Sequence, residues 1–183
     1  IVIGLSLVFL VPAYITLRQI CYLLAIFILA VGVFVDENPE KISSLLDAGI
    51  IDLAQLHGQE DEEYISQLRK LTRKKIIKAF KISTPNDVKN AENSTADYVM
   101  LDAGAGSGKL FDWSLIAGVN RPYFLAGGLD AENGAAAVER LKPFAVDVSS
   151  GIETAGKKDA AKMSAFIAAV RGEKKSHGHK VKI

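Results

Sequence analysis

The sequence predicts an α/β protein built around a parallel β-sheet, and three observations support this fold class. Short apolar runs rich in Val, Ile, Leu, Tyr and Phe recur along the chain, and successive runs start about 21 to 27 residues apart. Most runs precede a segment with a helix-start signal or helical periodicity, so strands and helices alternate. The runs are apolar at nearly every position, as expected of parallel strands that are buried on both faces.

We expect seven strands, at residues 2–9, 29–36, 51–58, 75–80, 98–102, 123–126 and 144–148. Each strand and the helix that follows it form one βα unit. A closed (β/α)8 barrel needs eight units, whereas an open doubly wound sheet does not need the eighth. Both arrangements agree with the pattern of strands and helices.

Helices are expected at residues 15–28, 38–49, 60–71, 84–93, 130–141 and 157–171, with a further helix entry at 111–113. Asn38 and Thr84 each precede a proline, which is the signal of a capped helix start. The helix over 60–71 should bury one face, made of Tyr64, Ile65, Leu68 and Leu71.

Length and composition indicate one globular domain. The chain has 183 residues, of which 49% are hydrophobic and 23% charged, which excludes a disordered protein. We expect residues 1–171 to form a single (β/α) barrel domain and residues 172–183 to form a basic polar tail. The net charge of +1 gives no support to a nucleic-acid partner. The single cysteine, Cys21, cannot form an intramolecular disulfide, so we expect a cytoplasmic protein.

The first 35 residues are unusually apolar, because Arg18 and Gln19 separate two uncharged stretches. A membrane span needs about 18 consecutive apolar residues, and each stretch falls just short of that length. We therefore favour two buried strands around one apolar helix over a membrane segment. No basic region opens the chain, so a signal peptide is not expected.

Residues 103–109 contain several glycines, but they do not form a familiar nucleotide site. Ala103 stands where a P-loop requires glycine, and Leu110 stands where it requires Ser or Thr. Lys109 replaces the third glycine of the dinucleotide-binding pattern. The sequence supports neither an NTPase nor an NAD enzyme.

Two small-residue loops end the last two strands, and they are candidates for phosphate binding. Gly127-Gly128 follows one strand and Ser149-Ser150-Gly151 follows the other. Glycines let backbone N–H groups approach an anion, serine hydroxyls add donors, and the loops after the last two strands commonly bind phosphate in barrels. The structural alternative is a pair of ordinary tight turns.

Three titratable side chains stand at or near strand ends, where parallel α/β proteins bind their ligands. Asp102 is the best general-acid candidate, because partial burial raises carboxyl pKa values toward a useful range; its alternative role is to cap a turn. Asp147 either bonds a substrate or braces its loop. His57 is a substrate-site candidate, although a lone histidine is more often a packed residue. His177 and His179 in the Lys-rich tail are a weak metal signal, so we expect no metal site.

Five motifs in order resemble the phosphoribosylanthranilate isomerase family over about residues 31–171. They are Gln55-Leu-His-Gly58, Leu101-Asp102, Gly104 to Lys109 with Phe111-Asp-Trp113, Leu125 to Leu129, and Val146 to Glu153 with Gly156-Lys-Lys-Asp159. Each motif alone is weak, but their order and spacing are specific.

The resemblance implies a (β/α)8 barrel that rearranges N-(5-phosphoribosyl)anthranilate into its 1-deoxyribulose isomer in tryptophan biosynthesis, without a cofactor. It implies that Asp102 is the general acid that opens the ribose ring, and that His57 and Asp147 lie near the substrate. It further implies that the phosphate lies on Gly127, Gly128, Ser149, Ser150 and Gly151.

The amino end departs from the family pattern. Residues 2–9 resemble the family's second strand, so the first strand and helix, with the cysteine that acts as general base, are unmatched. Cys21 is expected on a helix, away from the strand ends, and does not replace it. The family's Ser-Pro-Arg is also unmatched, since Ala13 and Tyr14 follow Pro12.

Two classes of function follow. The first is the isomerase, monomeric or homodimeric, acting on a small phosphorylated substrate. The second is a catalytically degenerate barrel relative that binds phosphate ligands and uses residues 1–35 to contact a partner or a bilayer. Other sugar-phosphate enzymes of the same barrel type are disfavoured by the matches at 55–58 and 146–153.

Overall fold

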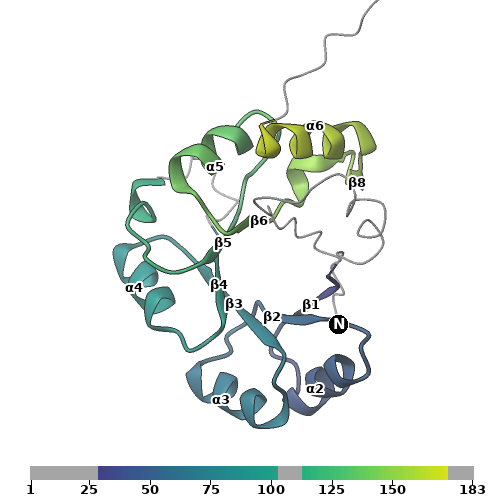
Figure 1. Ribbon diagram of the computed structural model, residues 1–183, viewed down its shortest axis with the longest axis vertical. Coiled ribbons are helices and arrows are strands. Elements are labelled where there is room, and N and C mark those ends of the chain that lie inside the picture. The colour runs from purple at the N-terminus through teal and green to yellow at the C-terminus, as the bar shows by residue number, and fades with distance from the viewer. Residues whose placement is uncertain (1–28, 103–112, 173–183) are drawn as a thin grey trace, which may run out of the picture.

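A computed structural model describes residues 29–102 and 113–172, and these residues form an α/β fold around a curved parallel sheet (Figure 1). The sheet contains β1 (Val31–Phe34), β2 (Leu53–Leu56), β3 (Lys75–Lys81), β4 (Tyr98–Asp102), β5 (Tyr123–Ala126) and β6 (Ala145–Val146). All neighbouring strands are parallel, and their order in the sheet is their order in the chain. A doubly wound sheet reverses its strand order, and this sheet does not. The described sheet is therefore a curled half-barrel.

Helices cover the convex side of this half-barrel (Figure 1). They are α2 (Pro39–Asp47), α3 (Glu62–Leu71), α4 (Pro85–Asn93), α5 (Gly134–Leu141) and α6 (Ala160–Arg171), with short 3-10 turns η1 (Trp113–Leu115) and η2 (Ser150–Ile152). Strands β7 (Glu153–Thr154) and β8 (Lys157–Lys158) form a separate antiparallel hairpin. Within the described residues, no helix has the length and apolarity that crossing a membrane requires.

The helix starts predicted at Asn38 and Thr84 are confirmed. The Asn38 side chain accepts hydrogen bonds from the backbone N–H groups of Glu40 and Lys41. Thr84 and Asp87 form a reciprocal capping box at the start of α4. The expected strand at 2–9, the helix at 15–28 with Cys21, the loop at 103–109 and the tail beyond Gly172 lie outside the described residues.

The last predicted helix starts later than expected. Asp159 accepts hydrogen bonds from the backbone N–H groups of Ala161 and Lys162, so α6 begins at Ala160. Lys157 and Lys158 instead pair with β7. Ala155 and Gly156 join the two strands with φ values of 51° and 74°, as a type I′ hairpin turn requires.

Two further expectations are corrected. The strand expected over residues 144–148 is confined to Ala145–Val146. Leu71 is not part of the buried helix face: it is the last residue of α3, the backbone becomes extended at Thr72, and 42% of Leu71 stays exposed.

Side chains alternate between the two faces of the sheet, as strand geometry requires. The outer face packs against the helices, as with Leu56 and Ile76 under α2 and α3. The inner face carries Val31, Leu53, Ile77, Met100, Phe124, Ala126 and Ala145. Asp102 lies two residues beyond Met100 and in register with Ala126. Asp102 therefore lies at the carboxyl edge of the inner apolar layer.

Candidate functional site

Three strands bring the predicted titratable residues to the same edge of the sheet. The backbone N–H of His57 donates to Phe34 O, which places the residue directly after β2. Asp102 is the last residue of β4, and Asp147 directly follows β6 with its N–H bonded to Leu125 O. The carboxyl ends of parallel strands are where such sheets bind ligands, so the position of all three fits a site.

His57 is held between two acceptors. Its Nδ1 lies 2.9 Å from Gln55 Oε1, and its Nε2 lies 3.7 Å from Asp102 Oδ2. The second distance is an ion-pair distance, slightly longer than a hydrogen bond, and such contacts often tighten when a ligand binds.

Asp102 and Asp147 both affect the protonation of His57. Interaction with the Asp102 carboxyl raises the pKa of His57 above 6.5, against the opposing effect of burial. The charges of Asp102 and Asp147 also raise the pKa, and that of Lys78 lowers it. Asp147 is therefore close enough to His57 to act on its protonation.

A buried ion pair supports the loop after β2, and the sequence analysis missed it. Lys78 Nζ donates to Glu60 Oε2 (2.9 Å) and to Gly58 O (2.8 Å). Glu60 in turn accepts hydrogen bonds from the backbone N–H groups of Gly58 and Asp36. Both side chains are almost fully buried, at 6% and 1% exposure. The pair thus ties the loops after β1 and β2 together beside His57.

The two predicted phosphate loops touch each other. A Cβ atom added to Gly151 would overlap the carbonyl oxygen of Leu129, so this close approach needs glycine. Gly127 and Gly128 have φ values of 91° and 65°, in the left-handed region. The Asn133 side chain donates to Gly128 O at 2.8 Å, and α5 begins one residue later. Backbone N–H groups and a helix start therefore lie close together, as an anion site requires.

Lys158 adds a positive charge beside the second loop. Its Nζ donates to Ser149 O (3.0 Å) and to Ser149 Oγ (3.3 Å), and it pairs with Glu153 at 2.7 Å. The sequence analysis missed this residue because it placed Lys158 at a helix start. The hairpin of β7 and β8 is what returns the lysine to the loop.

The structure thus brings His57, Asp102 and Asp147 together, and it brings Gly127 and Gly128 into the same region as Ser149, Ser150 and Gly151. Their roles in binding and catalysis stay predictions. Among the described residues, no group of three or more His, Cys, Asp or Glu side chains could hold a metal ion.

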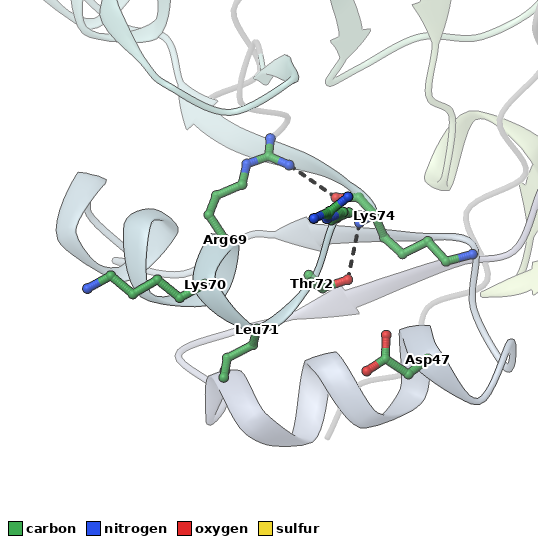
Figure 2. Close-up of a pocket in the computed structure, with 7 residues that line it drawn as sticks. Asp47, Arg69, Lys70, Leu71, Thr72 and Lys74 are labelled. Carbon is green, nitrogen blue, oxygen red and sulfur yellow. Dashed lines mark hydrogen bonds between the residues drawn. The ribbon is translucent and has the colours of Figure 1, made fainter.

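A pocket of about 580 Å³ lies at the opposite end of the sheet (Figure 2). It is lined by Asp47, Arg69, Lys70, Leu71, Thr72, Arg73 and Lys74. Figure 2 shows that its wall is the turn between α3 and β3, held by hydrogen bonds from Arg69 to Lys74 O and from Lys74 N–H to Thr72. This turn precedes a strand, so the pocket is distant from the carboxyl edge where the titratable residues meet.

Comparison with known proteins gives one consistent family. The family model described as "N-(5'phosphoribosyl)anthranilate (PRA) isomerase" matches residues 23–169. The N-(5'-phosphoribosyl)anthranilate isomerase of Endomicrobium trichonymphae is 41% identical over 147 residues, which cover 78% of this chain and 72% of that protein. The Clostridium acetobutylicum isomerase is 40% identical over 150 residues, covering 77% and 72%.

Solved structures agree. The chain is similar to phosphoribosyl anthranilate isomerase from Thermotoga maritima, with a TM-score of 0.72 and 40% identity over 85% of this chain and 78% of that one. It is also similar to a phosphoribosyl anthranilate isomerase in complex with reduced 1-(o-carboxyphenylamino)-1-deoxyribulose 5-phosphate, with a TM-score of 0.69 and 38% identity, covering 87% and 81%.

Proposed function

The chain belongs to the N-(5'-phosphoribosyl)anthranilate isomerase family, and on that premise we propose that it catalyses the family's reaction. The protein is an isomerase of tryptophan biosynthesis, which converts N-(5'-phosphoribosyl)anthranilate to 1-(2-carboxyphenylamino)-1-deoxyribulose 5-phosphate. The alternative of a degenerate phosphate-binding relative is not favoured, because the matching relatives are named as isomerases.

The observation that carries the proposal is the pairing of Asp102 with His57 at the carboxyl edge. Ring opening needs a proton on the ribose ring oxygen as the bond from that oxygen to C1 breaks. A positioned carboxyl group supplies such a proton with a rate gain of about 10²- to 10⁴-fold. Asp102 takes this role, and His57 and Asp147 contact the substrate beside it.

A base then takes the C2 proton, which gives an enolamine. The enolamine becomes the ketone when C1 gains a proton and the enol hydroxyl loses one. The reaction moves hydrogen within one molecule, so it needs no redox cofactor.

The substrate phosphate binds between the two glycine loops. Gly127, Gly128, Ser149, Ser150 and Gly151 offer backbone N–H groups and hydroxyls, and the close approach of Gly151 to Leu129 supports a single shared site. Lys158 adds a favourable charge beside Ser149.

The finer architecture belongs to the same proposal. Residues 1–171 form a single (β/α) barrel domain of the (β/α)8 type, with seven βα units and the family's first unit unmatched, and residues 172–183 form a basic polar tail. The protein is cytoplasmic and binds no nucleic acid. It is a monomer or a homodimer; monomers generated from the dimeric Thermotoga maritima enzyme have been solved and resemble this chain with a TM-score of 0.69.

The test is the Asp102→Asn substitution, made in the chain as its native source produces it. We expect turnover to fall by about 10³-fold, because the amide cannot donate the proton. Affinity for the reduced product analogue, measured by calorimetry, should change less than about tenfold. Asp52→Asn is the matched control, since Asp52 bonds the Ala30 N–H at the amino end of the sheet. Normal turnover in Asp102→Asn would refute the acid role, and loss of binding by orders of magnitude would show a structural one.

A further inference from the structure

Gln55 is a buried polar residue on the inner face of the sheet, in contact with His57, which in turn lies beside the proposed acid. It lies within β2 and is 1% exposed. Its Oε1 lies 2.9 Å from His57 Nδ1, and its Nε2 is buried with no hydrogen-bond partner among the described residues. Burying an amide with one unmatched donor destabilises the fold. A glutamine at this buried position therefore indicates a function for its other amide atom, Oε1.

The contact to His57 sets where the imidazole carries its proton. A carbonyl oxygen only accepts hydrogen bonds, so Nδ1 must be the donor in this pair. In a neutral imidazole the other nitrogen is then an acceptor. Nε2 thus presents a lone pair to the Asp102 carboxyl, 3.7 Å away.

We propose that Gln55 is a positioning residue that holds His57 in its Nδ1–H tautomer, so that Nε2 shares a proton with the Asp102 carboxyl. The catalytic meaning of this proposal rests on the proposed function, but the tautomer does not. The opposite tautomer would place Nε2–H against Asp102, which favours the carboxylate and leaves it no proton to give.

The proton balance is simple. One proton lies between His57 Nε2 and Asp102 Oδ2 before reaction. It passes to the ring oxygen of the substrate as the C1–O bond breaks, and the pair is left as a carboxylate and a neutral imidazole. A proton from solvent then restores the pair.

Other charges act on the same imidazole. Asp147 follows β6 and, with Asp102, favours the protonated imidazole, whereas Lys78 on β3 opposes it. Glu60 forms an ion pair with Lys78 and weakens that opposition. Acidic groups at the ends of β4 and β6 thus favour the shared proton, and the contact to Gln55 sets the tautomer.

The experiment is ¹⁵N NMR of the histidine rings in the full 183-residue chain without ligand. Only three histidines are present, His57, His177 and His179, and loss of signals in His57→Asn assigns the first. We expect neutral His57 to carry its proton on Nδ1. Gln55→Met removes the acceptor at similar volume and should shift the population toward Nε2–H. Gln59→Met, at an exposed position, is the matched control and should change nothing.

Gln55→Glu keeps an acceptor at the same place, so His57 should stay Nδ1–H in this variant even if Gln55→Met does not fold. An Nε2–H tautomer in the unaltered chain or in Gln55→Glu would overturn the proposal, as would an unchanged tautomer in a folded Gln55→Met. An isomerase assay run in parallel separates the two proposals: absent turnover with the expected tautomer would count against the proposed function alone.

Discussion

Gly151→Ala tests whether the two glycine loops form one phosphate site. The added Cβ would overlap the Leu129 carbonyl oxygen and would lie 2.9 Å from the Leu129 carbonyl carbon and 3.0 Å from Asp130 Cβ. None of these atoms is the end of a flexible side chain. The two loops must therefore move apart.

The structure sets the size of the effect. Ordinary van der Waals contact begins at 3.4 Å, so the carbonyl carbon alone demands a movement of about half an ångström, 3.4 less 2.9. Overpacking of this kind costs about 1–3 kcal/mol of folding stability. Losing one hydrogen bond to a charged phosphate costs a further 1.5–3 kcal/mol or so of binding, which is about a 10- to 150-fold weaker Kd.

Calorimetry with the reduced product analogue measures the Kd, and urea unfolding measures the stability. Gly118→Ala is the matched control, because a Cβ there meets no atom within 4 Å and the backbone is not left-handed. It should leave binding unchanged and raise stability by about 0.5 kcal/mol. Unchanged affinity in Gly151→Ala would refute the shared phosphate site.

Two further predictions concern the surroundings of His57. Lys78→Met should lower the free energy of unfolding by about 3 kcal/mol, because it leaves the Glu60 charge buried without its cation. Adding Glu60→Gln should recover part of this loss, as measured by urea unfolding. A loss below about 1 kcal/mol in Lys78→Met would contradict the buried pair. The interaction with Asp102 that raises the pKa of His57 should also stabilise the fold. This stabilisation should be fully present below pH 6.5 and should be lost as pH rises through the raised pKa. The free energies of unfolding of the unaltered chain and of His57→Asn should therefore differ at about pH 5.5 and converge at about pH 8.5. Two curves that stay parallel between these pH values would contradict a stabilising His57–Asp102 interaction.

Local signals were readable from the sequence. Asn38 and Thr84 determine their helix starts through bonds to residues two or three positions ahead, and such contacts depend on nothing distant. The position of Asp102 followed from the rule that parallel strands present their carboxyl ends at one edge. Both kinds of inference use only spacing along the chain and the strand period.

Contacts between distant segments could not be read in this way. Lys78 and Glu60 lie 18 residues apart and meet only because β3 runs beside β2. Lys158 reaches Ser149 only because two residues with positive φ turn the chain back as a hairpin. Such partners depend on sheet register and turn geometry, which a single sequence leaves open.

The most direct test of the proposed site is a crystal structure of the protein with reduced 1-(o-carboxyphenylamino)-1-deoxyribulose 5-phosphate. We predict that the phosphate binds the backbone N–H groups of the loops at 127–128 and 149–151, with the sugar chain beside Asp102. A phosphate bound elsewhere, for example among the basic residues Arg69 to Lys74 at the opposite end of the sheet, would contradict the site.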